Sequence, residues 1–335
     1  MIMSKRVEWQ GLPYYPIGQF YRSTFGEKVY KIPVTTAVTC PNREGLRGMK
    51  TCNFCDVHGS AAYPEYQEMN LREQIETARD RVQRRVNANQ FLVYFQAYTT
   101  TYEKVAELRE QFEIAASYAE VKGVVVGTRP DCISDALFDL WNEYSERFFV
   151  AVEFGVQSFD EDQLIWMRRG HSAKRSIKAI ERTARETDVN LGLHLILGNP
   201  GEDLEQMKWS AEICNALPIQ NVKLHNLHVL ENTPLADDYR AGKFEPLERD
   251  EYSERVRVFL QHLRPELAVH RLSALASRSE ELIAPKWTMK KMESYQGIID
   301  YLNSKDSWQG QFFDSEKPIE PAIDQLMKQE YYVES

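Results

Sequence analysis

The chain has 335 residues, of which 43% are hydrophobic and 27% charged, and its formal net charge is −9. This length is enough for one large core with a small appendage, and the composition is ordinary for a globular protein. No apolar run is long enough to span a membrane, and the first ten residues carry Lys5, Arg6 and Glu8 in place of a secretory signal's apolar stretch. We therefore expect a cytoplasmic protein in which any RNA contact depends on a local basic patch.

From about residue 31, apolar strand-like runs alternate with amphipathic helix-like segments. Strands are predicted at 31–38, 91–96, 123–127, 148–154, 189–197 and 221–230. Helices are predicted at 71–86, 101–121, 134–147, 172–187 and 204–217. The runs are nearly continuous and β-branched, as is typical of strands buried on both faces of a parallel sheet. The pattern predicts a parallel α/β fold, either a six-stranded partial barrel or an open Rossmann-like sheet.

Two flanks lie outside this alternation. Residues 1–30 are expected to form an N-terminal extension that packs on a core at 31–235. Residues 236–335 are expected to form a C-terminal extension, with a helix near 249–263, a strand-like run at 267–272 and a further helix after Pro285. We therefore expect one core flanked by two extensions.

Three of the five cysteines, Cys40, Cys52 and Cys55, follow the first predicted strand within sixteen residues. In barrel folds, the loops after the strands carry the chemistry. Thiolates bind soft metals, and three of them leave one iron of a cubane cluster open to a small molecule. The alternative is a closed structural zinc site with His58 as the fourth ligand. The cysteines alone leave both sites open.

The other two cysteines, Cys132 and Cys214, stand alone in or beside helix-like segments. An odd count with a single tight cluster argues against a disulfide framework. We expect these two residues to be small buried side chains and not ligands.

The spacing Cys40-x₁₁-Cys52-x₂-Cys55, with Phe54 before the last cysteine, resembles the radical S-adenosylmethionine (SAM) cluster motif in a long-spaced form. Further segments match that family in the same order along the chain, at 128–131, 152–158, 168–171 and 197–202. They resemble the branch that includes the Elongator catalytic subunit and the oxygen-independent coproporphyrinogen oxidases. The segments 39–55, 222–233 and 284–287 resemble the YhcC/YtqA-like radical SAM proteins more closely.

The resemblance implies a partial (βα)6 TIM-like barrel of the radical SAM type. It also implies a [4Fe–4S] cluster held by Cys40, Cys52 and Cys55, which reduces SAM and cleaves it to a 5′-deoxyadenosyl radical. An electron donor such as flavodoxin or ferredoxin would reduce the cluster. In this family the cofactor carries the hard chemistry, while the protein positions it and excludes water.

The resemblance also assigns SAM contacts: Gln157 to the ribose, Arg169 to the carboxylate region, Phe54 and Gly198 to the adenine, with Glu153 and His194 facing the cavity. Gln96 is a further expected SAM contact. It begins the segment Gln96-Ala97-Tyr98-Thr99, which stands where the family has Gly-Gly-Glu, so the residues that contact the SAM amino group differ from those of the family.

Simpler roles remain open for several of these residues. Gln157 could cap the following helix, and Arg168 and Arg169 could be solvated charges. The Gly198 segment could be only a tight turn. His225 and His228 lie three apart on the sixth predicted strand, so we expect their side chains to point to opposite faces.

The favoured substrate is a tRNA wobble uridine whose C5 carboxymethylaminomethyl group is converted towards aminomethyl, as the resemblance implies. Basic residues crowd one predicted helix and the cysteine loop, where they could contact phosphates (Arg79, Arg81, Arg84 and Arg85; Arg43, Arg47 and Lys50). Tyr98 or Tyr102 could stack a flipped base. The helix arginines could equally form a solvated face. The alternatives are a radical SAM enzyme acting on a small metabolite and a non-catalytic, zinc-stabilised binding protein.

Overall fold

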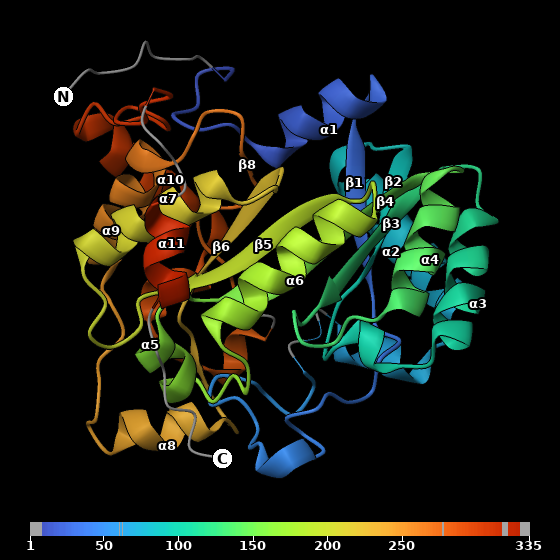
Figure 1. The fold of residues 1–335 in the computed structure, drawn as a ribbon, viewed down its shortest axis with the longest axis horizontal. Coiled ribbons are helices and arrows are strands. Elements are labelled where there is room, and N and C mark those ends of the chain that lie inside the picture. Colours follow the sequence, from blue (N-terminus) through green and yellow to red (C-terminus); the bar gives the residue numbers. More distant parts are fainter. Residues whose placement is uncertain (1–8, 60, 62, 277, 317–320, 329–335) are drawn as a thin grey trace.

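The structure is a computed structural model that describes residues 9–59, 61, 63–276, 278–316 and 321–328. Its main element is a seven-stranded sheet in the order β1-β2-β3-β4-β5-β6-β8, and every neighbouring pair is parallel. The strands are β1 Val29–Val34, β2 Gln90–Phe95, β3 Val121–Thr128, β4 Phe149–Gln157, β5 Asn190–Leu197, β6 Asn221–Asn226 and β8 Ala268–Val269. The sheet curls into a half-barrel with helices on its outer face (Figure 1). The predicted partial barrel is therefore confirmed, with seven strands instead of six.

The helices follow the predicted alternation. They are α1 Ile17–Phe25, α2 Leu71–Val86, α3 Val105–Ala116, α4 Asp135–Ser145, α5 Glu161–Trp166, α6 Ala173–Glu186, α7 Leu204–Ala216, α8 Pro234–Arg240, α9 Arg249–His262, α10 Lys291–Ser304 and α11 Pro321–Lys328. α2 has its predicted bounds because both ends are capped. The Asn70 side chain accepts from the Glu73 N–H, the Glu73 carboxylate accepts from the Asn70 N–H, and Asn87 ends the helix at φ 49.

Side chains alternate between the two faces of each strand, and this alternation separates two cores. On β2, Phe91, Val93 and Phe95 pack in the main core with the outer helices, whereas Leu92 and Tyr94 belong to a small inner cluster. Residues of α1 complete the inner cluster, so α1 closes the half-barrel at the amino ends of the strands. Figure 1 shows α1 at one end of the sheet and α5 and α8 at the other. The interior near the carboxyl ends is left for polar side chains.

The segment expected to be a C-terminal extension supplies the seventh strand. In β8, Ala268 pairs with Asn221 of β6, and the Val269 N–H donates to the Tyr15 carbonyl at 2.7 Å. This strand thereby joins both flanks to the sheet. Residues 1–8 and 329–335 of the two expected extensions, including Lys5, Arg6 and Glu8, lie outside the described residues.

The sixth predicted strand is two separate strands. β6 ends at Asn226, and β7 Val229–Leu230 pairs instead with β9 Leu282–Ala284 in a small antiparallel sheet. The break turns the chain at the carboxyl end of the barrel.

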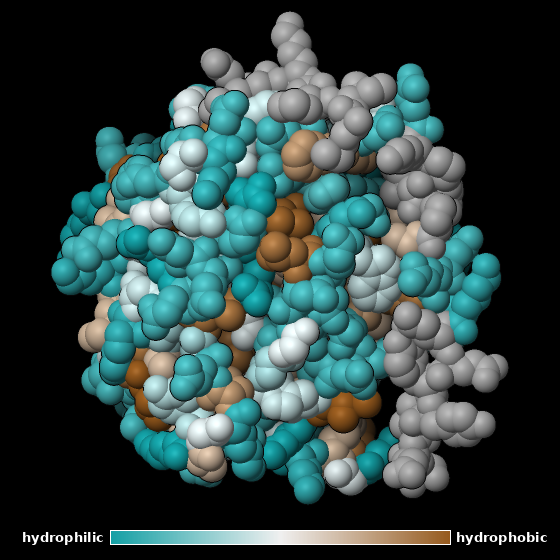
Figure 2. Space-filling view, turned by 90° about the vertical axis from the view of Figure 1, so that its left-hand side faces the viewer, coloured by the Kyte–Doolittle hydropathy of each residue, from teal (hydrophilic) through white to brown (hydrophobic). Residues whose placement is uncertain are grey.

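Within the described residues, no helix is long and apolar enough to cross a membrane. The face that includes α9 is mostly hydrophilic, with apolar residues in small separate patches (Figure 2). Nothing on this face suggests a continuous apolar surface.

Candidate active site

A cavity of about 340 Å³ lies at the carboxyl ends of the strands. It is lined by nine of the ten predicted site residues: Cys40, Cys52, Phe54, Cys55, Gln96, Glu153, Gln157, Arg169 and His194. Gly198 is not on this wall. Its N–H donates to Glu202 Oε1 at 2.7 Å, and a Cβ there would lie 3.2 Å from Leu247 Cδ1. The adenine contact of Gly198 stays a prediction that its position does not favour.

The three cysteines of the loop after β1 lie on one wall of the cavity, beside two arginines. Cys40 and Cys52 are buried, and Cys55 is half-buried. Arg169 Nη1 donates to Cys52 Sγ at 3.3 Å, and Arg43 Nη2 donates to Cys55 Sγ at 3.5 Å. Burial raises the pKa of the Cys55 thiol to about 12, while Arg43 opposes that shift. Guanidinium groups this close favour the thiolate, which is the form that binds metal.

The residues around these thiols fit an iron–sulfur cluster with a polar small molecule beside it. Gln157 Oε1, Arg43 Nε and Arg169 Nε are buried and have no hydrogen-bond partner among the described residues. Buried polar atoms normally have partners, so these three indicate a ligand. In the described part of the chain, no three His, Cys, Asp or Glu side chains converge on a single metal ion, and His58 is not part of the cavity wall. A cubane spreads its cysteines over different irons, so its thiols need not converge as zinc ligands do.

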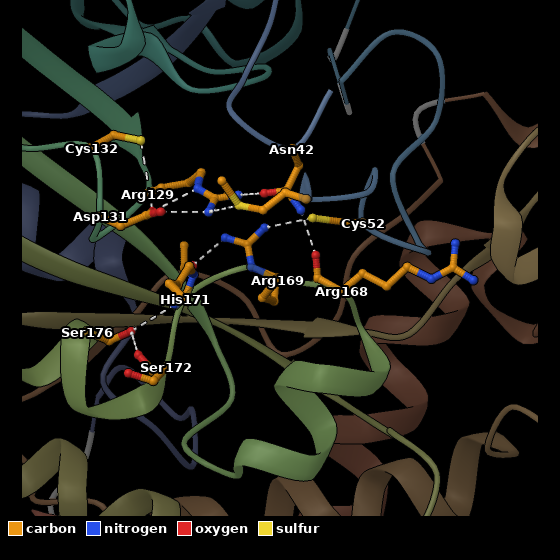
Figure 3. A network of polar contacts seen from close by, with 12 residues as sticks. Asn42, Cys52, Arg129, Asp131, Cys132, Arg168, Arg169, His171, Ser172 and Ser176 are labelled. Carbon is orange, nitrogen blue, oxygen red and sulfur yellow. Dashed lines mark hydrogen bonds and ion pairs between the residues drawn. The ribbon is translucent and has the colours of Figure 1, made fainter. Parts of the chain in front are cut away.

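A buried polar network fixes the cysteine loop against the end of β3 and the turn after α5 (Figure 3). Asn42 Nδ2 donates to the carbonyls of Lys50 at 2.7 Å and Arg168 at 2.6 Å, and Asn42 Oδ1 accepts from Arg129. Arg129 also donates twice to Asp131, each time at 2.8 Å. The Thr-Arg-Pro-Asp segment after β3 therefore positions the loop, a role that its sequence did not reveal.

Three residues of the cavity wall have a strained, left-handed backbone. Ala97, Tyr98 and Gln157 have φ values of 86, 50 and 73. Residues other than glycine rarely adopt positive φ values, because the conformation costs about 1–3 kcal/mol per residue. Such strain is typical of functional sites. Two of these residues replace the family's Gly-Gly-Glu motif, so this segment keeps a left-handed backbone without glycine.

The two candidate stacking tyrosines are both tied to the cysteine loop. Tyr98 packs on Gly59, where a Cβ would lie 2.4 Å from the Tyr98 ring, and its hydroxyl donates to the Val57 carbonyl at 3.0 Å. The Tyr102 hydroxyl donates to Glu44 at 2.7 Å. These contacts brace the loop, and they favour a structural role over stacking for both rings.

Glu153 lies on the cavity wall, but its carboxylate already forms ion pairs with two lysines. It is bonded to Lys31 and, at 3.2 Å, to Lys223, whose Nζ also donates to the Tyr94 hydroxyl at 2.8 Å. Burial alone raises the pKa of Glu153, but Lys223 and Lys31 outweigh it and hold that pKa well below its usual range. A direct contact between Glu153 and SAM remains a prediction.

His225 and His228 both line the cavity, with ring centroids 5.1 Å apart. The expectation that they point to opposite faces is wrong, because β6 ends at Asn226 and strand alternation does not extend to His228. Lys223 and Arg271 also line the cavity and were missed. Strand alternation places Lys223 on the same face as His225, but no sequence signal connects Arg271 to the site.

Three of the four basic residues predicted on α2 lie near the amino ends of the strands, away from the cavity, whereas Arg81 stacks on Tyr63. Arg79 Nη1 donates at 3.0 Å to Glu120, which immediately precedes β3, and Lys28, just before β1, donates to the carbonyl of Val86 at the end of α2. Arg84 and Arg85 in the last turn of α2 therefore lie near the amino ends of the strands. Contact between this helix and phosphates stays a prediction that the position of these arginines does not favour, whereas Arg47 and Lys50 are exposed in the cysteine loop itself.

Comparisons with known proteins agree with this geometry. The chain matches the model of the Radical SAM superfamily over residues 35–213 and that of the Radical_SAM C-terminal domain over residues 219–304. It is 32% identical over 300 residues to the uncharacterized protein YtqA of Bacillus subtilis (strain 168), covering 90% of this chain and 92% of YtqA. It is 34% identical over 283 residues to protein YhcC of Escherichia coli (strain K12), covering 83% of this chain and 89% of YhcC.

Two further matches are partial. The solved structure of archaeal Elp3 from Methanocaldococcus infernus has a TM-score of 0.63 and 17% identity, covering 84% of this chain and 64% of that one. That likeness concerns the fold alone. A tRNA uridine(34) acetyltransferase of Methanocaldococcus infernus is 31% identical over 133 residues, covering 38% of this chain and 24% of that protein.

Membership of this family of enzymes argues against the alternative of a non-catalytic zinc protein. It implies that the chain binds a [4Fe–4S] cluster and SAM. The two models together cover most of the chain, and both full-length relatives exceed 30% identity. The chain therefore belongs to the radical SAM superfamily of enzymes, in the family of YtqA and YhcC.

Proposed function

We propose that this enzyme acts on a tRNA wobble uridine and converts its C5 carboxymethylaminomethyl group towards aminomethyl. The observation that carries the proposal is the 31% identity, over the shared 133 residues, with a protein named as a tRNA uridine(34) acetyltransferase. The exposed cations of the cysteine loop, Arg47 and Lys50, support it, because they provide local positive charge on a chain with a net charge of −9.

In this proposal Cys40, Cys52 and Cys55 would hold the cluster, and Gln157 and Arg169 would bind the polar groups of SAM. When bound, the cluster and SAM supply one-electron chemistry and an acceptor for one hydrogen atom. The CH₂ carbon between the amine nitrogen and the carboxylate would lose that hydrogen atom and one electron, and the electron would pass to a one-electron acceptor of the iron–sulfur class. Water then adds to the resulting imine and releases the amine and glyoxylate.

Mass spectrometry of tRNA nucleosides from a deletion strain tests the proposal. We expect the carboxymethylaminomethyl form to accumulate at the wobble position and the aminomethyl form to disappear. Expression of the wild-type chain should restore the profile. An unchanged nucleoside profile would favour the second candidate, a radical SAM enzyme that acts on a small metabolite, which is consistent with the net charge of −9.

The SAM contacts are tested separately. Gln157→Ala and Arg169→Ala should each weaken SAM binding by about 1–3 kcal/mol, since each removes a buried polar partner. Equilibrium binding of SAM to the reconstituted protein, with iron content measured in parallel, checks this. Arg84→Ala, at the far end of the barrel, is the control. Unchanged SAM affinity in both site variants would show that the family roles belong to other residues.

The cysteine loop should also contact the RNA backbone. Arg47→Glu combined with Lys50→Glu should weaken tRNA binding and lower the slope of log affinity against log salt by about one for each phosphate that the loop no longer neutralises. Arg84→Glu with Arg85→Glu makes the same charge change at the other end of the barrel and should have a smaller effect. Filter binding at several salt concentrations compares the two pairs. If the α2 pair has the larger effect, the RNA does not approach over the cysteine loop.

A further inference from the structure

The wall of the cavity formed by β6 and the segment after β8 carries an excess of positive charge. The cysteine loop follows β1 at one edge of the curled sheet, and Arg271 follows β8 at the other edge, so the two face the cavity from opposite sides. We call Lys223, His194, His225, His228 and Arg271 the basic recess; all five line the cavity.

The recess cations outnumber their carboxylate partners. Glu153 is shared by Lys31 and Lys223. Among the described residues, no carboxylate lies within ion-pair distance of Arg271. The Arg271 Nε donates to the Leu224 carbonyl at 3.1 Å, and its Nη2 lies 3.5 Å from His194 Nε2. Arg271 is therefore a cavity-wall cation without a carboxylate of its own, since Glu153 is already bonded to Lys31 and Lys223, and such a charge is costly to bury unless an anion binds there.

Two further polar nitrogens on the same wall have no partner among the described residues. Asn226 Nδ2 and His228 Nε2 belong to buried cavity-lining residues, 1% and 6% exposed, and neither atom has a hydrogen-bond partner in the described part of the chain. Burial and, to a smaller extent, the charge of Arg271 lower the pKa of His228 to about 3, so the ring is neutral. A neutral imidazole still offers one N–H, and an amide nitrogen offers two. Asn226 Nδ2 is thus an unused donor, and His228 Nε2 is a second one in the tautomer that carries its proton there, so both can serve an anionic acceptor.

We propose that the basic recess binds an anionic group of the substrate, with Arg271 as its fork-shaped partner. Resting on the proposed function, this group is the carboxylate of the carboxymethylaminomethyl side chain. Guanidinium binds a planar carboxylate through two parallel hydrogen bonds. The recess thereby distinguishes the carboxylated nucleoside from its aminomethyl product, which has lost the anion, and it directs the substrate carboxylate away from the cysteine wall.

The test compares two anticodon stem-loops that differ only at the wobble uridine, one with carboxymethylaminomethyl and one with aminomethyl. Binding to the reconstituted enzyme with SAM, without reductant, is measured by fluorescence anisotropy. We expect the wild-type enzyme to prefer the carboxylated stem-loop by about 10- to 100-fold. Arg271→Gln should remove this preference and leave SAM affinity unchanged. Arg264→Gln, a matched change of an arginine that donates to the Ile219 carbonyl outside the cavity, should keep the preference.

Several results would overturn the inference. Equal binding of the two stem-loops by the wild-type enzyme would do so without any variant, as would a loss of SAM affinity in Arg271→Gln, which would assign the recess to the SAM carboxylate. Equal weakening of both stem-loops in that variant would assign the recess to a backbone phosphate.

If neither stem-loop binds, the proposed function fails and the recess is tested alone. Acetate should then raise the melting temperature of the wild-type enzyme more than acetamide does, and Arg271→Gln should abolish the difference. If acetate and acetamide change the melting temperature equally, the proposal that the recess binds an anion would be wrong as well.

Discussion

Replacing Cys40, Cys52 or Cys55 with Ala is expected to abolish cluster formation, so that the reconstituted variants bind almost no iron and produce no 5′-deoxyadenosine from SAM. Each thiol lies on the same cavity wall, and removal of one of three ligands exposes the cluster to solvent and oxidation. Iron and sulfide analysis, with the visible absorption of anaerobic preparations, measures the first effect, and chromatography of SAM products measures the second.

Cys132→Ala and Cys214→Ala are the matched controls for this experiment. Cys214 is fully buried in α7, and Cys132 lies half-buried in the turn after β3, whose Arg129 and Asp131 belong to the network that fixes the cysteine loop. Both variants should retain wild-type iron content. A wild-type chain that holds one tightly bound zinc, and no cluster under strict anaerobiosis, would contradict the assignment of the three cysteines.

Glu153→Gln should lower the free energy of unfolding by about 3–5 kcal/mol, because it leaves Lys31 and Lys223 without their shared counter-ion. Gln has nearly the same shape as Glu, so the effect reports charge and not volume. The folded-state pKa of Glu153 lies well below its usual value. Its stabilising contribution is therefore complete at neutral pH and is lost as the pH falls towards that folded-state pKa.

Urea unfolding followed by tryptophan fluorescence measures this decrease in stability. Glu113→Gln is the control, since Glu113 is exposed and pairs with Arg147 on the surface, where ion pairs contribute little. A Glu153→Gln variant as stable as the control would show that the two lysines are neutral in the folded protein, and the count of excess charge in the basic recess would then be wrong.

Local patterns in the sequence determined the parallel α/β class, and the resemblance carried by the cysteine motif supplied the barrel type and the cofactor chemistry. The bounds of α2 followed from a capping box and a left-handed Asn87, both of which involve residues within a few positions of each other. Five of the six predicted strands appear near their predicted places and the sixth is broken after Asn226; a buried parallel strand is recognisable because it is a continuous apolar run. The cysteine spacing is local as well, and the resemblance built on it led to the family that the comparisons show.

The tertiary structure alone decided which charges face the cavity. Arg271 enters the site because β8 adds a seventh strand to the open edge of the sheet, and a strand of two residues leaves little pattern in the sequence. The break after Asn226 brings His225 and His228 to one wall, where a regular strand would separate them. Three of the α2 arginines lie at the other end of the barrel because a crossover helix returns the chain to the amino ends of the strands. Each depends on contacts between residues distant in sequence, whereas periodicity and spacing report only on neighbours.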